Sequence, residues 1–217
     1  MSFRNKYQSR PSERGFSVIE LLIVVGVAVI LGAIALPQMI SARRMLRSSA
    51  MSRQVLTQLR LARQEAMSQR QAMTVQYDDT NKRLVVIDHN ASGRSLLTAT
   101  GYPNTAGSVQ IRTINLAGEG LPASEIAYGI PSGAQTAALG DSTSMTTLPT
   151  TTKKINITFQ PDGSVIDGNG NAANFALYFY NTKASINTAS AVSVLGAGGR
   201  VKIWRYDSSA TVNKYVE

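Results

Sequence analysis

The chain has 217 residues, enough for one membrane segment and one ordinary domain. It contains no cysteine, which excludes a disulfide framework and a thiolate metal site. Its formal net charge of +9 is concentrated near the N-terminus, where residues 1–15 hold four basic residues against one acid and residues 16–70 hold seven arginines against two. The basic character therefore belongs to an N-terminal arm and the helix that we expect behind it.

Residues 14–37 read RGFSVIELLIVVGVAVILGAIALP and contain one acid, Glu20, within a long apolar run. Extended from Phe16 to Ile40, the run reaches the roughly 20 residues that span a bilayer core of about 30 Å. The basic residues before it predict a cytoplasmic N-terminus and a body on the other side of the membrane. The small residue Gly15 precedes the run, whereas the cleavage site of a secretory signal follows it. A cut at Gly15 would leave the apolar segment as the mature N-terminus.

The stretch from Arg14 to Leu22, followed by an apolar helix and Pro37, resembles the N-terminal signature of type IV prepilins and type II secretion pseudopilins. The resemblance implies that residues 1–15 are a leader peptide, which a membrane-embedded prepilin peptidase removes after Gly15. The same enzyme would methylate the new amine of Phe16. The resemblance further implies assembly with other pilins or pseudopilins into a helical filament, on an inner-membrane assembly platform.

A role for Glu20 follows from its charge. A carboxylate in hydrocarbon costs about 2.5–3.5 kcal/mol even on lenient insertion scales, so the chain needs a partner for it. Glu20 lies about one helical turn from Phe16. In a staggered bundle the carboxylate of one subunit can meet the terminal ammonium of its neighbour, which would neutralise both charges in a low dielectric. We expect Glu20 to act in filament assembly, against the alternative of a plain anchor with a tolerated acid.

The helical pattern continues from Ser41 to about Met73. Pro37 removes an amide donor and predicts a helix break, either a bend or a melted stretch. A helix from Phe16 to Gln71 would be about 84 Å long at 1.5 Å per residue, which suits a filament stem. Two stripes are predicted on it: an apolar face of Val55, Leu59, Ala62 and Ala66, widened by Leu56, and a basic stripe of Arg53, Arg60, Arg63 and Arg70.

The stretch from Leu59 to Arg70 resembles the helix end of minor pilins and pseudopilins of the GspH/FimT type. The simplest interpretation of Arg63 and Glu65 within it is a solvated helix surface. We expect the arginines to pair with neighbouring subunits or lipid phosphates rather than with nucleic acid.

After the helix the hydrophobic period changes to two, which predicts strands. The predicted strands are 72–77, 84–87, 109–116, 154–160, 175–180, 191–195 and 200–206. A helix followed by a run of strands predicts an α+β fold, in which a long N-terminal helix, its first half transmembrane, packs on antiparallel sheets. Residues 88–107 and 131–152 read as loops. We expect the first to hold His89 as a turn residue, and the second to be a mobile excursion or part of a subunit contact.

The segment Gly199-Arg200-Val201-Lys202 resembles the Gly-Arg strand near the end of GspH/FimT-type proteins. In some members involved in natural transformation, the related Gly-Arg-x-Arg pattern binds DNA. Alternation places Arg200, Lys202 and Trp204 on one face, where two cations and an aromatic could engage phosphate and stack on a base. The alternative is an edge strand that its charges keep soluble.

These patterns predict four parts: a leader (1–15), a transmembrane and assembly helix (16–40), an amphipathic stem (41–73) and a β-rich periplasmic or extracellular domain (74–217). We find no catalytic constellation, metal motif or cofactor motif, and expect a substrate of enzymes rather than an enzyme. The leading interpretation is a minor pilin of a type IV pilus, single-pass in the inner membrane and then part of a filament, which helps to initiate filament assembly and supports twitching motility. The alternatives are a type II secretion minor pseudopilin and a DNA-binding subunit at a pilus tip.

Overall fold

The computed structural model describes residues 16–90, 108–118, 120–134, 138–167, 169–210 and 214–217. The predicted leader (1–15), with Gly15, lies outside the described residues. The chain divides into two compact units, residues 1–40 and 41–217, which we describe separately. One helix, α1 (Val18–Gln69), contributes residues to both units.

In the first unit, α1 begins at Val18 and remains helical through Pro37. A proline inside a helix removes a single backbone donor, and the surrounding turns keep their own hydrogen bonds. The helix is therefore unbroken at Pro37 in the isolated chain, and a bend or a melted stretch there in the bilayer or the filament stays a prediction. The large apolar side chains between Phe16 and Ile40 are 50–85% exposed. The segment is long and apolar enough to cross a membrane, with a mean hydropathy of 2.9 in its most apolar window.

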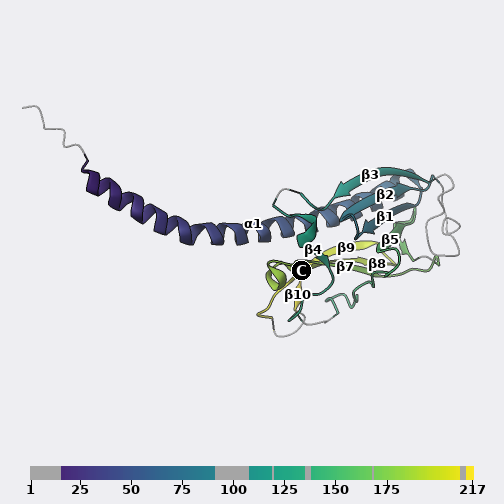
Figure 1. Cartoon of the computed structure of the whole chain (residues 1–217). Coiled ribbons are helices and arrows are strands. Elements are labelled where there is room, and N and C mark those ends of the chain that lie inside the picture. The colour runs from purple at the N-terminus through teal and green to yellow at the C-terminus, as the bar shows by residue number, and fades with distance from the viewer. Residues whose placement is uncertain (1–15, 91–107, 119, 135–137, 168, 211–213) are drawn as a thin grey trace, which may run out of the picture. The chain divides into compact units, whose positions relative to one another are not determined.

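In the second unit, the rest of α1 accompanies two five-stranded sheets in which all pairs of neighbouring strands are antiparallel (Figure 1). The first sheet has the order β3 (Val109–Asn115), β2 (Arg83–Asp88), β1 (Met73–Asp78), β5 (Lys154–Phe159) and β6 (Val165–Ile166). The second has the order β10 (Tyr215–Val216), β9 (Arg200–Tyr206), β8 (Ser190–Leu195), β7 (Phe175–Asn181) and β4 (Ile126–Tyr128). Two short 3-10 helices, η2 (Ala123–Glu125) and η3 (Ser185–Thr188), complete the regular elements of the described chain.

The predicted α+β fold is confirmed, as are the seven predicted strands, each within one residue at either end. Within the described ranges, the prediction missed β4, β6 and β10. These strands have two or three residues, too few to establish an alternating pattern.

One hydrophobic core joins the helix to both sheets. Val55, Leu59, Ala62 and Ala66 are fully buried, which confirms the predicted apolar face of the helix. Alternate residues of the two sheets meet this face, including Val75, Tyr77 and Val86 of the first sheet and Leu177, Phe179 and Val192 of the second. Because both sheets bury side chains against the same helical stripe, the second unit has a single core.

The expectation of a mobile segment at 131–152 is wrong for residues 138–152, the longer of its two described parts. Leu139 and Thr143 are each 2% exposed. The Thr146 amide donates to the Ala176 carbonyl at 3.0 Å, and the Ala176 amide donates to Thr146 Oγ1 at 2.9 Å. Strand β4 pairs only with residues 179–181 of β7, so Ala176 needs another partner for its backbone. The Thr-rich segment supplies it.

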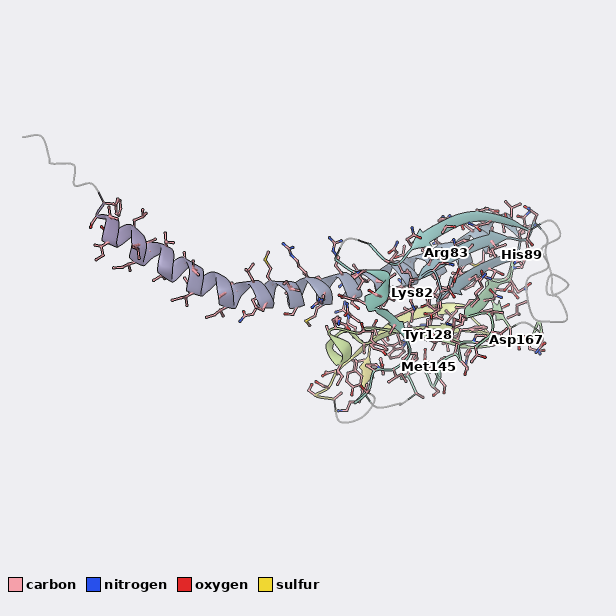
Figure 2. The ribbon with its side chains drawn as sticks, viewed as in Figure 1. Lys82, Arg83, His89, Tyr128, Met145 and Asp167 are labelled. Carbon is pink, nitrogen blue, oxygen red and sulfur yellow. The ribbon has the colours of Figure 1, made fainter. Side chains whose placement is uncertain are left out.

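The prediction that His89 is a turn residue is also wrong. His89 follows β2 directly, at the opposite end of that strand from Lys82 and Arg83 (Figure 2). It is 2% exposed, and its Nε2 lies 2.7 Å from Thr74 Oγ1 while its Nδ1 lies 2.8 Å from Ser108 Oγ. Burial lowers the pKa of His89 from its ordinary value of 6.5, although the nearby Asp88 carboxylate acts in the opposite direction. The ring is therefore held neutral within a buried polar network.

We expect the stability of the protein to decrease as the pH falls below about 6.5. The folded protein disfavours the protonated form of His89, so the pKa of this histidine is lower in the folded state than in the unfolded state. The stability that neutral His89 contributes is therefore complete above the pKa of the unfolded state. It is lost as the pH falls from there through the pKa of the folded state. The loss is at most about 1.4 kcal/mol per pH unit, the slope for one proton. Urea unfolding at pH 7.5 and 5.5 measures it, and His89→Gln should flatten this part of the profile because the chain has one histidine. If the free energy of unfolding changed equally with pH in wild type and in His89→Gln, His89 would not be the group responsible.

Candidate anion-binding cleft and assembly segment

The residues predicted to act in assembly lie at the start of the helix. Phe16 is 85% exposed, two residues before Val18, and Glu20 lies in the first turn. An acid in this position is favoured by the unpaired amides and the dipole of a helix N-terminus. Among the described residues, Glu20 has no ion-pair partner. The structure thus presents an exposed aromatic residue and a carboxylate about one turn apart, and their roles in assembly stay predictions.

A basic cleft of about 430 Å³ lies in the second unit, between the last turns of α1 and the turn that joins β8 to β9. Its lining includes four cationic side chains, from Arg60, Arg63, Arg200 and Lys202, and the single carboxylate of Glu217. The structure places the predicted Arg200 and Lys202 together in this cleft. The hypothesis of a DNA-binding subunit rests on Arg200, Lys202 and the basic stripe of the helix, to which Arg60 and Arg63 belong. The structure places these two arginines beside Arg200 and Lys202, although they lie about 140 residues earlier in the chain.

Arg63 shapes the cleft by binding two turns at once. Its Nε donates to the Gly163 carbonyl at 3.2 Å, and its Nη2 donates to the Gly198 carbonyl at 3.0 Å. Arg60 acts similarly, since its Nη2 donates to the Val201 carbonyl at 3.1 Å. The prediction of a solvated Arg63 is therefore wrong, because this guanidinium connects the helix to the β5–β6 and β8–β9 turns.

Glu65 is not a solvated residue either. Its Oε1 lies 2.5 Å from Arg112 Nη2, and the same guanidinium donates through Nη1 to Gln58 Oε1 at 3.2 Å. Arg112 belongs to β3, the edge strand of the first sheet. Arg63 thus connects α1 to turns of both sheets, and Glu65 connects it to the first sheet through Arg112.

Trp204 has a different role from the predicted one. Alternation along β9 holds, because Val201 packs in the helix core whereas Trp204 packs with Tyr178 and Tyr215 in a second cluster. Trp204 is only 6% exposed, however, and its Nε1 donates to Ser193 Oγ at 2.8 Å. The indole is therefore not available to stack on a base. Instead, Lys202 Nζ lies 5.1 Å from the centre of its ring, a cation–π arrangement that orients the ammonium.

Of the two predicted cations, Lys202 has an ion-pair partner and Arg200 has none among the described residues. Lys202 Nζ forms an ion pair with Glu217 Oε2, and the Lys202 side chain is 14% exposed. Arg200 is exposed and has no ion-pair or hydrogen-bond partner within the described part of the chain. Arginine presents a planar fork of donors that matches phosphate and carboxylate. Arg200 is therefore the cation of the cleft most available to an outside anion.

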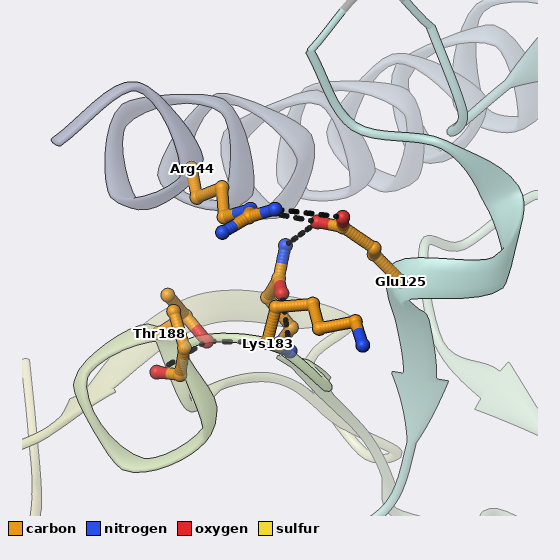
Figure 3. A network of polar contacts seen from close by, with 6 residues as sticks. Arg44, Glu125, Lys183 and Thr188 are labelled. Atoms are coloured by element: carbon orange, nitrogen blue, oxygen red, sulfur yellow. Dashed lines mark hydrogen bonds and ion pairs between the residues drawn. The ribbon is translucent and has the colours of Figure 1, made fainter. Parts of the chain in front are cut away.

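A second polar network holds the N-terminal turns of the second unit's helix (Figure 3). Arg44 Nη2 donates to Glu125 Oε1 at 3.3 Å, and Asn181 Nδ2 donates to Glu125 Oε2 at 3.0 Å. The backbone N–H of Asn181 donates to Thr188 Oγ1 at 2.9 Å. Glu125 thus bridges the helix to the end of β7. No cluster of three or more potential ligand side chains occurs in the described residues to suggest a metal site.

Comparisons with known proteins give two similar structures. No protein-family model matches the sequence, and no curated protein matches it. The fold is similar to the crystal structure of the type IV minor pilin FimU from Pseudomonas aeruginosa strain PAO1, with 15% identity and a TM-score of 0.40 over 71% of this chain and 86% of that chain. It is also similar to the minor pseudopilin EpsH from the type 2 secretion system of Vibrio cholerae, with 15% identity and a TM-score of 0.43 over 76% and 99%.

We expect Gly199→Ala to destabilise the protein far more than Gly198→Ala. Gly199 has a φ of +57°, and a Cβ there would lie 1.9 Å from the Gly163 carbonyl oxygen, whereas a Cβ at Gly198 meets nothing within 4 Å. Backbone strain alone costs about 1–3 kcal/mol, and the clash adds to it. Urea unfolding followed by the fluorescence of Trp204, the single tryptophan, measures both variants. Equal free energies of unfolding would contradict the described packing of the two turns.

Proposed function

We propose that the protein is a minor pilin of a type IV pilus, held in the inner membrane by the N-terminal part of α1 before it enters a filament. The observation that carries the proposal is the exposed apolar helical segment of residues 18–40 with a single acid, Glu20, in its first turn. Contiguous apolar surface of this kind is rare on soluble monomers and marks a membrane or protein contact. Lipid covers it in the membrane, and the same segments of other subunits cover it in the filament.

The first steps of the proposed pathway follow from the residues at the N-terminus. The prepilin peptidase cuts between Gly15 and Phe16 and methylates the new amine of Phe16. The basic residues before the cut keep the N-terminus cytoplasmic, which puts the β-rich domain in the periplasm. The inner-membrane platform then inserts the subunit, and Glu20 pairs with the terminal ammonium of a neighbouring subunit.

We expect Glu20→Ala to be processed normally but to be lost from filaments. The change removes the carboxylate and leaves both the cleavage junction and the apolar helix, so the mature chain should still begin at methylated Phe16, as mass spectrometry would show. Sheared surface pili should contain at least about tenfold less of the variant than of wild type, which immunoblotting measures. Ser17→Ala, a change in the same exposed turn without loss of charge, is the matched control. Normal incorporation of Glu20→Ala would remove Glu20 from the mechanism.

The alternative machine is a type II secretion system, in which the protein would be a minor pseudopilin. The N-terminal features support both machines equally, because each assembles subunits through such a helix. A deletion strain separates them: loss of surface pili and twitching supports the pilus, whereas a defect in protein export with normal pili supports the secretion system.

The basic cleft favours a second function, binding of DNA by the assembled subunit. Four cations from two separate segments converge there, and phosphates supply most of the affinity in nonspecific nucleic-acid binding. Arg200 is the most available of the four. Trp204 does not contribute stacking in this proposal, since its indole is buried.

If the cleft binds DNA, Arg200→Gln should weaken retention of single-stranded DNA and reduce the slope of log affinity against log salt by about one. The measurement is a gel-shift titration of the full-length protein in a non-ionic detergent at several salt concentrations. Arg53→Gln is the matched control, because Arg53 is an exposed helix arginine that does not line the cleft. DNA retention that does not weaken with rising salt would contradict binding at this site. So would an equal loss of DNA retention in Arg200→Gln and Arg53→Gln.

A further inference from the structure

The basic cleft already holds an anion of its own. The Glu217 carboxylate is the single acidic group in the lining, and it forms an ion pair with Lys202. The four cations are not equally free: Arg63 donates to two carbonyls, Arg60 donates to one, and Lys202 is paired. Arg200 alone lacks a partner among the described residues. An anion from outside would therefore bind Arg200 first and gain Lys202 only by competing with Glu217.

The two partners of this ion pair are held very differently. The Lys202 side chain is 14% exposed and its ammonium lies over the Trp204 ring, whereas the Glu217 side chain is 57% exposed. No other hydrogen bond or ion pair of the Glu217 side chain occurs in the described residues. The ammonium is thus fixed by the fold and the carboxylate is not. Because the Glu217 carboxylate is largely exposed, water can solvate it once it leaves Lys202, so its displacement costs little free energy.

A phosphate group is a stronger competitor than a carboxylate for this pair of cations. It offers oxygens to the Arg200 fork and a charge to the Lys202 ammonium together, and Arg–phosphate contacts are often bidentate. Counted over the side chains of the lining, the formal charge is +3 with the Glu217 carboxylate and +4 without it. The cleft volume of about 430 Å³ leaves room for a phosphate group between α1 and β9.

We propose that Glu217 is a built-in competitor for the cleft, and that phosphate groups of a nucleic-acid strand bind by displacing its carboxylate from Lys202. The proposal rests on the second function given above, and it identifies what limits binding there. The affinity for a ligand is then set by how much more strongly its phosphate binds Lys202 than the Glu217 carboxylate does. The cleft then discriminates against weak single anions and favours ligands that present several phosphates together.

The test uses inorganic tripolyphosphate as the probe and isothermal titration calorimetry of the full-length protein in a non-ionic detergent. We expect Glu217→Gln to tighten binding by a factor of about two to five, the range expected when an exposed ion pair is removed. Arg200→Gln and Lys202→Gln should weaken it, and Arg53→Gln should match wild type. Sodium chloride at equal ionic strength controls for screening. Unchanged or weaker binding by Glu217→Gln, or no binding by any of these proteins, would overturn the proposal.

The same variants separate this proposal from the DNA-binding function on which it rests. In one outcome, Glu217→Gln binds tripolyphosphate more tightly, but DNA retention is unchanged in both Glu217→Gln and Arg200→Gln. This outcome would support Glu217 as the competitor and refute DNA as the ligand. Conversely, DNA retention that depends on Arg200 but does not increase in Glu217→Gln would support the DNA site and refute the competition.

Discussion

The face of α1 formed by Val55, Leu59, Ala62 and Ala66 is the constraint on which the second unit depends. Both sheets bury alternate side chains against it, so neither sheet has a complete core without the helix. Two of the four residues are alanines, which leave room for large side chains such as Tyr77 and Phe179 near the helix. Burying one leucine contributes about 1.5–3 kcal/mol. The stability of the β-rich part is therefore inseparable from this stretch of helix.

Polar contacts then set how the surrounding turns meet that helix. Arg63 joins the β5–β6 and β8–β9 turns, Glu65 joins β3 through Arg112, and Arg44 joins the end of β7 through Glu125. Gly199 can approach the Gly163 carbonyl because it has no side chain, and this approach brings both turns within reach of one guanidinium. The basic cleft is thus a consequence of how the two turns are joined to the helix.

Periodicity was enough to predict most of the fold. A helical stripe and seven alternating runs identify α1 and the longer strands, because these patterns are local and each repeats several times. The partners of individual polar residues could not be predicted in the same way. Arg63 reads as solvated because its acceptors, Gly163 and Gly198, are at least 100 residues away and are backbone carbonyls, which no sequence motif reports. His89 reads as a turn residue because its partners are distant in sequence: Thr74 lies on β1 and Ser108 lies just before β3.

For the cleft, the sequence identifies the cations but not how many of them a ligand can use. Arg200 and Lys202 look equivalent in the strand pattern, and Arg60 and Arg63 look equivalent in the helix stripe. In the folded protein, Arg63 is part of the structure, Lys202 is paired and positioned by a buried Trp204, and Arg200 is open to solvent. The number of cationic side chains that are free to contact an anion is therefore smaller than the count of basic residues. The one acidic side chain of the lining, Glu217, pairs with the second cation, Lys202, so the ion pair and not the sequence pattern decides whether that cation is free.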